Sequence, residues 1–239
     1  MDFISKLTEA TFLKRHGAHM IEVGLSVQDK RLIYTTLRFP VPGVEVLGSR
    51  VWFSSDLAKK KNLHHWEMVE VDNGDKIMVN PVYARYLAVE AVKTGVLGQA
   101  YSEVTVDVYL PGTTTKVDFM VKQGSKYHFY WVQPIFWGDE IHRGFYPHSP
   151  LTSMKLLRDI FKAQTQGIDV EIVFVSLHGG VQRLILADHI DPVWGQWVRQ
   201  AQQQGVGLYA LGSQINEHGI FLGDSLPVVI PSRSSIVQK

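Results

Sequence analysis

The sequence predicts an α/β (α+β) protein in which a small β-barrel precedes a layered α/β domain. Three observations lead to this prediction: short strand-like runs without a helix pattern in the first third, a change of pattern at Asn80-Pro81, and helices interleaved with strands after it. Short strands separated by turn signals favour a small barrel, of which the OB-fold is one form. Helix, three strands, helix, strand, helix, strand is the order of an α/β layered domain.

The first part contains five strand-like runs, at residues 19–27, 31–37, 49–53, 66–71 and 76–79. Gln28-Asp29-Lys30 is a turn signal between the first two runs, and Asp72-Asn73-Gly74-Asp75 is one between the last two. The change of pattern then places a first domain at residues 1–78 and a second at 79–239.

The second part begins with a helix, because Asn80 is a capping residue and Pro81 suits the first helical position. Gly95 is expected to end this helix. The remaining elements are expected as strands at 103–110, 116–121 and 127–133, a helix at 152–166, a strand at 170–175, a helix from Asp191-Pro192 to Gly205, and strands at 206–211 and 214–222.

Composition excludes several classes of function. The 239 residues carry 24 Lys+Arg, 23 Asp+Glu and no Cys, and 45% of them are hydrophobic, as in an ordinary globular protein. The absence of Cys excludes a disulfide framework, a thiolate nucleophile and Cys-ligated metal centres. A net charge of +1 argues against an indiscriminate polyanion binder.

The charge is unevenly distributed along the chain. Through Trp66 there are 10 Lys+Arg and 6 Asp+Glu, a surplus of 4, and the acids between Glu67 and Asp75 then cancel it. The total therefore hides a modest basic region in the barrel part, which fits a weak and selective binder. The start of the chain lacks a leader pattern, and no apolar run of roughly 18 residues occurs, so a cytoplasmic location without membrane association is expected.

An ordered series of short matches resembles the sugar fermentation stimulation protein A (SfsA) family. The resemblance runs from about Ala10 to Val228. It implies an N-terminal OB-like domain joined to a PD-(D/E)xK (restriction-endonuclease-like) nuclease domain. The stretches that carry it are Val51-Trp52, Lys59-Lys60-Lys61, His64, Trp66-Glu67, Val79-Asn80, Lys116-Val117-Asp118-Phe119, Leu177-His178, Val181-Gln182-Arg183, Ala187-Asp188-His189-Ile190-Asp191-Pro192, Ala201-Gln202-Gln203-Gln204-Gly205-Val206 and Ser225-Leu226-Pro227-Val228.

The nuclease pattern of that family is degenerate in this chain. The family pattern is roughly a Glu, then Arg-Ile-Asp-Phe, then Ile-Glu-Val-Lys, in which the acids hold divalent cations and the Lys stabilises charge. Asp107 stands for the first Glu, and Asp118 keeps the Asp. Trp131 stands where the second Glu is expected, and Gln133 stands for the Lys.

These replacements predict a disabled centre. Trp131 removes an oxygen ligand and fills the space with an apolar ring, whereas Gln133 could still orient a water. The resemblance therefore implies that Asp107, Asp118 and Gln133 are vestigial catalytic positions. No cofactor is expected, and Mg²⁺ or Mn²⁺ only if Asp107 and Asp118 still bind metal. A relocated acid, Asp139 or Glu140, would be needed to restore a full site.

Basic and aromatic residues of the barrel part form the candidate nucleic-acid surface. Lys side chains beside stackable rings are what a nucleic-acid groove uses for phosphates and bases. The lysine triplet is also compatible with a solvated loop, as charge runs usually are. The candidate binding residues are Lys14, Arg15, Lys59, Lys60, Lys61, His64 and Trp66.

Two further groups of rings and histidines remain open in function. His64-His65 and the pair His142/His148 lack an acid at ligand spacing, so no zinc site is expected. Trp131, Phe136 and Trp137 form an aromatic group that is either filled core or a docking surface for a partner.

The sequence thus predicts a nucleic-acid (DNA) binding protein, a catalytically inactive nuclease homologue with a regulatory or accessory role. Its partner would be DNA or RNA, bound weakly and in a salt-sensitive way. Two alternatives stay open: an active metal-dependent DNA or RNA nuclease with a relocated acid, and a protein–protein adaptor that uses the aromatic region around Trp131.

Overall fold

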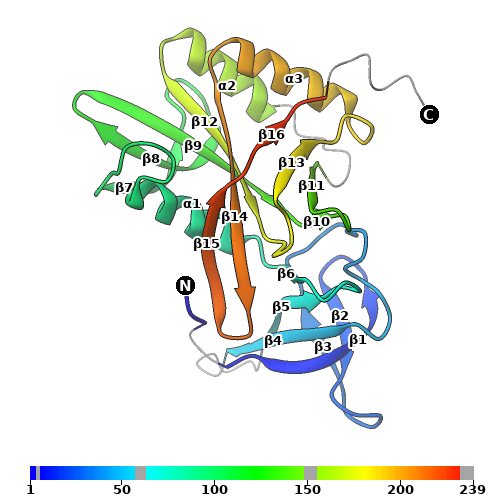
Figure 1. Ribbon diagram of the computed structural model, residues 1–239. Helices are drawn as coiled ribbons and strands as arrows, with labels where there is room; N and C mark the ends of the chain where they lie inside the picture. The colour runs from blue at the N-terminus through cyan, green and yellow to red at the C-terminus, as the bar shows by residue number, and fades with distance from the viewer. Residues whose placement is uncertain (4–5, 57–62, 148–154, 232–239) are drawn as a thin grey trace.

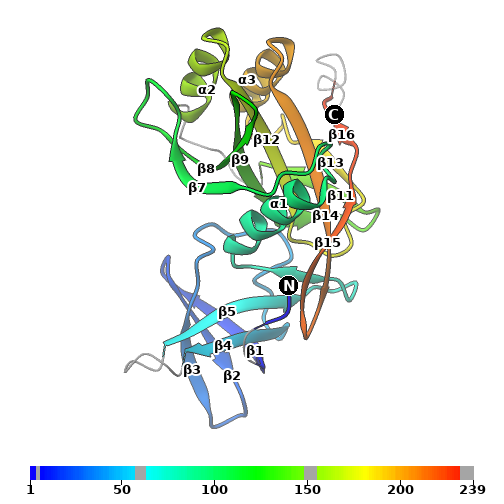
Figure 2. The same ribbon diagram turned by 90° about the vertical axis from the view of Figure 1, so that its left-hand side faces the viewer.

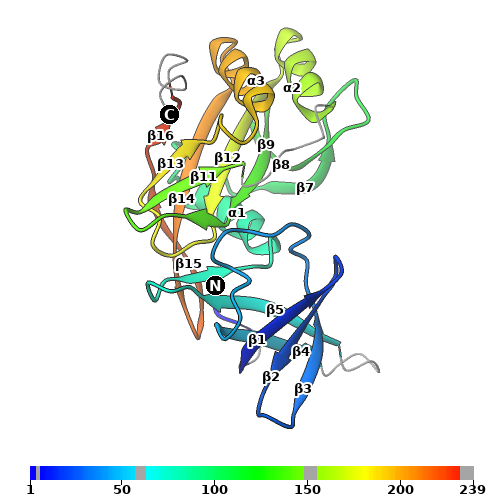
Figure 3. The ribbon, with the colours of Figure 1, turned by 90° about the vertical axis from the view of Figure 1, so that its right-hand side faces the viewer.

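The computed structural model describes residues 1–3, 6–56, 63–147 and 155–231 (Figure 1). Within these residues the chain forms one six-stranded sheet in its first part and a six-stranded and a four-stranded sheet in its second part. A β-barrel lies at one end of the molecule, and two helices lie at the opposite end (Figure 3).

The first sheet closes into the predicted barrel. Its strands are β1 (Thr8–His16), β2 (Met20–Gly24), β3 (Lys30–Tyr34), β4 (Arg50–Asp56), β5 (Leu63–Glu70) and β6 (Lys76–Met78). The strand order is β3-β2-β1-β4-β5-β6, and a pairing of Tyr34 with His65 joins β3 to β5, which closes a five-stranded OB-like barrel. β1 was not expected as a separate strand, although Ala10 and Phe12 are buried on one face of it.

The larger sheet of the second part combines a meander with parallel strands. Its members are β7 (Val104–Tyr109), β8 (Lys116–Gln123), β9 (Lys126–Ile135), β12 (Asp169–Ser176), β14 (Gly207–Asn216) and β15 (Gly219–Ser225). β9, β12 and β14 are parallel, and the order across the sheet is β15-β14-β12-β9-β8-β7. The prediction of one strand over 214–222 is wrong, because Asn216 accepts the N–H groups of His218 and Gly219 and turns the chain into a hairpin there.

A small second sheet was not predicted. It consists of β10 (Trp137–Gly138), β11 (Arg143–Tyr146), β13 (Arg183–Leu186) and β16 (Val228–Val229), in the order β10-β11-β13-β16. These strands have two to four residues each, which is too short for a periodic pattern to be recognised.

Three helices cover the larger sheet, and all three were predicted. They are α1 (Val82–Thr94), α2 (Lys155–Thr165) and α3 (Pro192–Gln203). Asn80 accepts the N–H of Val82, Gly95 ends α1 in a left-handed conformation, and Asp191 caps α3 by accepting the N–H of Trp194. α1 lies between the larger sheet and the barrel (Figure 2).

The apolar core does not divide where the two predicted domains do. One continuous cluster of buried side chains runs from the barrel interior, through α1, onto one face of the larger sheet. A second cluster fills the other face beneath α2 and α3. The division of the chain into two domains at residues 78/79 stays a prediction. In the order of elements it falls between β6, which ends at Met78, and α1, which begins at Val82.

Within the described ranges, no helix has the length and apolar character needed to cross a membrane.

Candidate nucleic-acid interface and nuclease-like centre

Two of the predicted nuclease positions, Asp118 and Gln133, lie where β8 and β9 separate, and the third, Asp107, lies on the neighbouring β7. The antiparallel ladder between the two strands runs from Gln123↔Lys126 to Phe119↔Tyr130 and ends there, while β9 stays paired with β12 along its other edge. Asp118, Trp131, Val132 and Gln133 follow this separation, and we call these four residues the β8–β9 fork. The structure therefore brings Asp118 close to the two replaced positions of the family pattern.

Asp118 is engaged by the backbone of the fork. Its carboxylate accepts a hydrogen bond from the N–H of Val132 at 2.7 Å, which satisfies a donor that no longer belongs to the ladder. Burial raises the pKa of the Asp118 carboxyl above its usual range, and the bond from Val132 and the positive charge of Arg85 offset this only in part. The Asp118 carboxylate thus has one of its oxygens already engaged as an acceptor within the fork.

Asp107 lies close to Asp118 but is paired with another residue. It adopts a φ of 53°, which Asp tolerates better than most side chains, and its carboxylate lies 2.8 Å from the guanidinium of Arg85 on α1. Its side chain is 61% exposed. The negative charge of Asp107 also opposes ionisation of Asp118, so the two acids act on each other electrostatically.

The two replaced positions are part of the protein's own packing. Trp131 is half-buried and packs against the core cluster beneath α2 and α3. The side-chain oxygen of Gln133 accepts a hydrogen bond from the hydroxyl of Tyr146, and its amide nitrogen donates to the carbonyl of Val132 at 2.7 Å. Tyr146 is buried against Phe174 and Trp194, so Gln133 faces a packed interior and not an open site.

The residues of the fork do not fit a divalent cation. In the part of the chain that the structure describes, no group of three or more His, Asp or Glu side chains could hold a metal ion. Asp139 and Glu140, the acids expected to restore the site, line a different cavity together with Pro42 and Gly43 of the barrel part. The carboxylates near the fork are thus Asp118, which is bonded to the N–H of Val132, and Asp107, which is paired with Arg85.

The barrel carries a row of exposed and half-buried rings that crosses its strands. His16 pairs with Met20, Met20 with Tyr34, and Tyr34 with His65, so these side chains share one outer face. His19 stacks on Tyr34 with ring centroids 5.9 Å apart, and His65 meets Tyr34 edge-on at 5.5 Å. His16 and His19 are exposed, and Tyr34 and His65 are half-buried. We call His16, His19, Tyr34 and His65 the barrel ring face.

The sequence did not single out His19 or Tyr34 as functional. Tyr34 alternates with Ile33, which is fully buried in the barrel, so strand alternation alone would have placed Tyr34 outside. The stack itself depends on pairing between strands that are distant in sequence. Such pairing leaves no local signal.

Only part of the predicted basic surface is available to a ligand. Lys14 is 62% exposed and lies 3.5 Å from Glu22. The guanidinium of Arg15 binds the Glu45 carboxylate at two nitrogens and donates to the carbonyl of Leu37 at 3.0 Å. Arg15 is therefore a structural residue of the barrel.

Two of the predicted aromatic contacts have other roles. Trp66 is 1% exposed, stacks on Phe12 and donates its indole N–H to the carbonyl of Met68, so it has no face for a base and this part of the prediction is wrong. His64 packs edge-on against Phe53 and pairs with the hydroxyl of Ser55 at 2.9 Å. Burial lowers the pKa of His64. Lys59, Lys60 and Lys61 lie outside the described residues, as does His148.

A family model described as the sugar fermentation stimulation protein RE domain matches residues 80–219, more than half of the chain. The chain belongs to the sugar fermentation stimulation protein family. The predicted family is thereby confirmed.

The fold also matches a solved member of the family. The structure of Pyrococcus furiosus SfsA in complex with Ca²⁺ superposes with a TM-score of 0.84 over 96% of this chain and 98% of that chain. The two sequences are 17% identical, so this likeness shows the fold alone. The predicted fold class, an OB-like barrel followed by an α/β sheet unit, is confirmed.

Proposed function

We propose that this SfsA-family protein binds DNA or RNA weakly through the barrel ring face and does not cleave it, in a regulatory or accessory role. The observation that carries this proposal is the stack of the exposed His19 on the half-buried Tyr34, beside His65. Rings on the outside of an OB-like barrel offer stacking to bases without demanding a sequence. Lys14 projects from the same strand as His16, two residues away, and supplies a cation on that face.

The β8–β9 fork supports the non-catalytic part of the proposal. Metal-dependent cleavage needs carboxylates that are ionised and free to coordinate. Asp118 is buried and bonded to Val132, and Asp107 is paired with Arg85. Although Pyrococcus furiosus SfsA was solved with Ca²⁺, we propose no equivalent ion at the fork of this chain.

Binding to labelled oligonucleotides tests the proposal. Single- and double-stranded DNA and RNA are titrated with the full chain at low salt, about 50 mM, where phosphate contacts are strongest. We expect binding that weakens as salt rises. Tyr34→Ala is expected to weaken binding to single strands by roughly tenfold, because one stacked base contributes about 1–3 kcal/mol.

Tyr86→Ala is the matched control, since Tyr86 is an exposed tyrosine on α1 and not on the barrel. It should leave the affinity unchanged. The same oligonucleotides are then incubated with Mg²⁺ or Mn²⁺. Cleavage that is abolished by Asp118→Ala would show an active nuclease and overturn the non-catalytic assignment.

A second candidate function, a protein–protein adaptor, is favoured by a different surface. Trp137 packs against Phe145 with ring centroids 4.6 Å apart, and both rings meet the exposed His189. Phe136 is buried, so the aromatic group expected around Trp131 divides into core and surface. If no nucleic acid binds at low salt, this surface becomes the better candidate. Trp137→Ala should not alter nucleic-acid binding if the first proposal is right.

A further inference from the structure

Three histidines gather on the barrel ring face, and their charge depends on pH. His16 and His19 are exposed, and His65 is half-buried. The row from His16 to His65 crosses β1, β2, β3 and β5, so it extends about 15 Å, at about 4.8 Å for each strand spacing. Imidazole side chains gain a proton as pH falls from about 8 to about 5. The charge of this face therefore changes in a range in which Lys and Arg side chains stay charged.

The permanent charges beside these rings largely cancel. The Glu22 carboxylate lies 2.7 Å from Nε2 of His16 and 3.5 Å from Nζ of Lys14. While His16 is neutral, Lys14 and Glu22 offset each other. When His16 is protonated, one carboxylate faces two cations, and the group becomes positive. Arg15, the next residue of β1, is already bound to the Glu45 carboxylate.

The other charged groups near the row keep their charge as pH changes. Lys30, on the same strand as Tyr34, is four residues away, which is about 13 Å in an extended strand. Arg38 is exposed and follows Tyr34 by four residues, and Arg31 pairs with Asp29 at 3.1 Å. These cations supply an attraction for phosphate that does not vary with pH.

On the β5 side of the row, the nearest described acid is shielded. Glu67 is 5% exposed and accepts hydrogen bonds from Ser54 and Asn80. His64 is adjacent to His65 in the chain, but burial, together with the charge of Arg31, lowers its pKa. The pH-dependent charge of the row is therefore expected to come from His16, His19 and His65.

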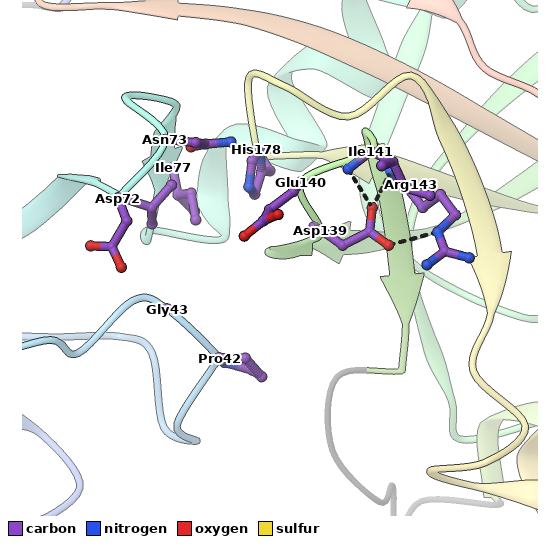
Figure 4. A pocket seen from close by; sticks show the side chains of 12 residues that line it. Pro42, Gly43, Asp72, Asn73, Ile77, Asp139, Glu140, Ile141, Arg143 and His178 are labelled. Carbon is purple, nitrogen blue, oxygen red and sulfur yellow. Dashed lines mark hydrogen bonds and ion pairs between the residues drawn. The ribbon is translucent and has the colours of Figure 1, made fainter. Parts of the chain in front are cut away.

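His178 shows the opposite situation in the second part of the chain. It lines a cavity of about 490 Å³ between the barrel part and the larger sheet unit (Figure 4). Its side chain is 5% exposed, and its ring packs against Gly138 and Val181. Burial lowers the pKa of His178, so this ring stays neutral. Exposure thus distinguishes the histidines of the barrel ring face from a histidine of the core.

The stack of His19 on Tyr34 places a titratable ring beside the ring proposed to stack on a base. The two rings are nearly parallel, with an interplanar angle of 5°. A protonated imidazole is attracted to the face of a phenol ring, so protonation keeps His19 in this place. Its N–H groups can then donate charge-assisted hydrogen bonds to a phosphate oxygen.

On the basis of the proposed function, we propose that nucleic-acid binding at the barrel ring face is coupled to protonation of His16, His19 and His65. Phosphates favour the charged rings, so the complex binds more protons than the free protein does. By linkage, the affinity is highest below the range in which the histidines titrate, and it falls as pH rises through that range. Above it, only stacking and the permanent cations remain. The pH of the surroundings thereby regulates binding.

Anisotropy titrations with a labelled oligothymidine test this coupling, because thymine does not titrate in the same range. The full chain is titrated at constant low salt from about pH 8 to about pH 5.5. A pKa that rises on binding by about half a unit per ring corresponds to roughly threefold in affinity, so three rings should give roughly thirtyfold. The affinity should also depend more steeply on salt at the lower pH, since more counterions are released.

The double variant His16→Gln/His19→Gln removes two of the three titrating rings from exposed positions. Its gain in affinity on acidification should fall to roughly threefold. His189→Gln/His218→Gln is the matched control, because it removes two exposed histidines that lie outside the barrel, and it should keep the full gain. This control also accounts for the general increase in the protein's positive charge as pH falls.

NMR titration of the histidine rings provides a second readout. The pKa values of His16 and His19 should be higher in the complex with oligothymidine than in the free protein, while that of His218 should not change. A structural role of the two rings would not produce this difference.

Three results would overturn the coupling: an affinity that does not change with pH, an equal gain in the double variant and its control, or histidine pKa values that binding does not alter. In each of these cases oligothymidine still binds, and the proposed function stands. No binding at any pH would overturn the proposed function and the coupling with it. The two proposals can therefore be distinguished.

Discussion

The β8–β9 fork and the barrel ring face are the two regions that we propose as remnants of a nuclease centre and as a nucleic-acid surface, and their side chains are engaged in opposite ways. In the fork, Asp118 is bonded to Val132 and Gln133 to Tyr146. On the barrel ring face, the exposed His19 stacks on the half-buried Tyr34. The polar groups of the fork are bonded to the protein itself, whereas on the barrel ring face His16 pairs with Glu22 and His19 and Tyr34 keep part of their surface exposed.

The proposed function requires that the capacity to bind nucleic acid and the capacity to cleave it can be lost separately. Trp131 stands where the family pattern is expected to have an acid, and its ring packs against the core cluster beneath α2 and α3. The proposed binding of nucleic acid through the barrel ring face depends on no single charged group, because stacking of a base requires only an accessible ring face. Three predictions test this contrast, from the largest expected effect to the smallest.

The largest effect is expected from a ring inside the barrel. Trp66→Ala removes a side chain that is 1% exposed and stacked on Phe12, so the free energy of unfolding should fall by about 3–5 kcal/mol. Tyr34→Ala, on the outside, should change it by less than about 1 kcal/mol. Denaturant titration of both variants measures the difference. Equal losses of stability would show that the barrel ring face is structural.

A smaller effect on stability is expected at two neighbouring cationic residues of β1, Lys14 and Arg15, which should differ from each other. Arg15→Ala removes charge-assisted hydrogen bonds to Glu45 and should lower the free energy of unfolding by about 2 kcal/mol. Lys14→Ala removes an exposed side chain and should leave the unfolding midpoint unchanged, while it reduces the salt dependence of nucleic-acid binding. The assignment of Arg15 as structural would be contradicted if both variants were equally stable.

The smallest effect concerns the ionisation of Asp118. Because its pKa is raised in the folded state, the neutral carboxyl stabilises the fold below the ordinary pKa of Asp. This contribution is lost as pH rises through the raised folded value. Asp118→Asn keeps an acceptor for Val132 but does not titrate. The difference in unfolding free energy between wild type and variant should therefore decline as pH rises.

Glu90→Gln provides the control for this pH series, as Glu90 is an exposed acid on α1. Its difference from wild type should not follow the same trend. A wild-type minus Asp118→Asn difference that is flat with pH would mean that folding does not raise the pKa of Asp118, which would contradict the burial of this carboxyl in the fork.

Local signals were enough to predict most of the fold. Gly95 and Asp191 marked the end of α1 and the start of α3, and turn residues separated the barrel strands. The hairpin at residues 216–219 was missed, because Asn216 and Gly219 interrupt a run whose apolar residues continue on both sides. The small sheet around Arg143–Tyr146 was missed because its strands are held by distant partners.

The candidate sites were harder to predict than the fold. Trp66 was predicted to be a binding residue because it is aromatic and lies near basic residues in the sequence. Its burial and its hydrogen bond to Met68 result from the closure of the barrel, which the sequence pattern does not reveal. The same closure brings Tyr34 next to His65 across a parallel pairing that has no counterpart in local sequence. Arg15 and Lys14 are adjacent and similar in the sequence, and only the position of Glu45 distinguishes them.

One continuous core joins the barrel, α1 and the larger sheet, so we expect that the two halves of the chain cannot fold when they are produced separately. A chain cut near residue 78 would leave α1 without the barrel residues against which it packs, and would open the barrel to water along that side. Both pieces would expose apolar surface and tend to aggregate. If an isolated barrel failed to bind nucleic acid, misfolding of the fragment would explain the failure. Point variants of the intact chain are the appropriate tool for assigning function to either half.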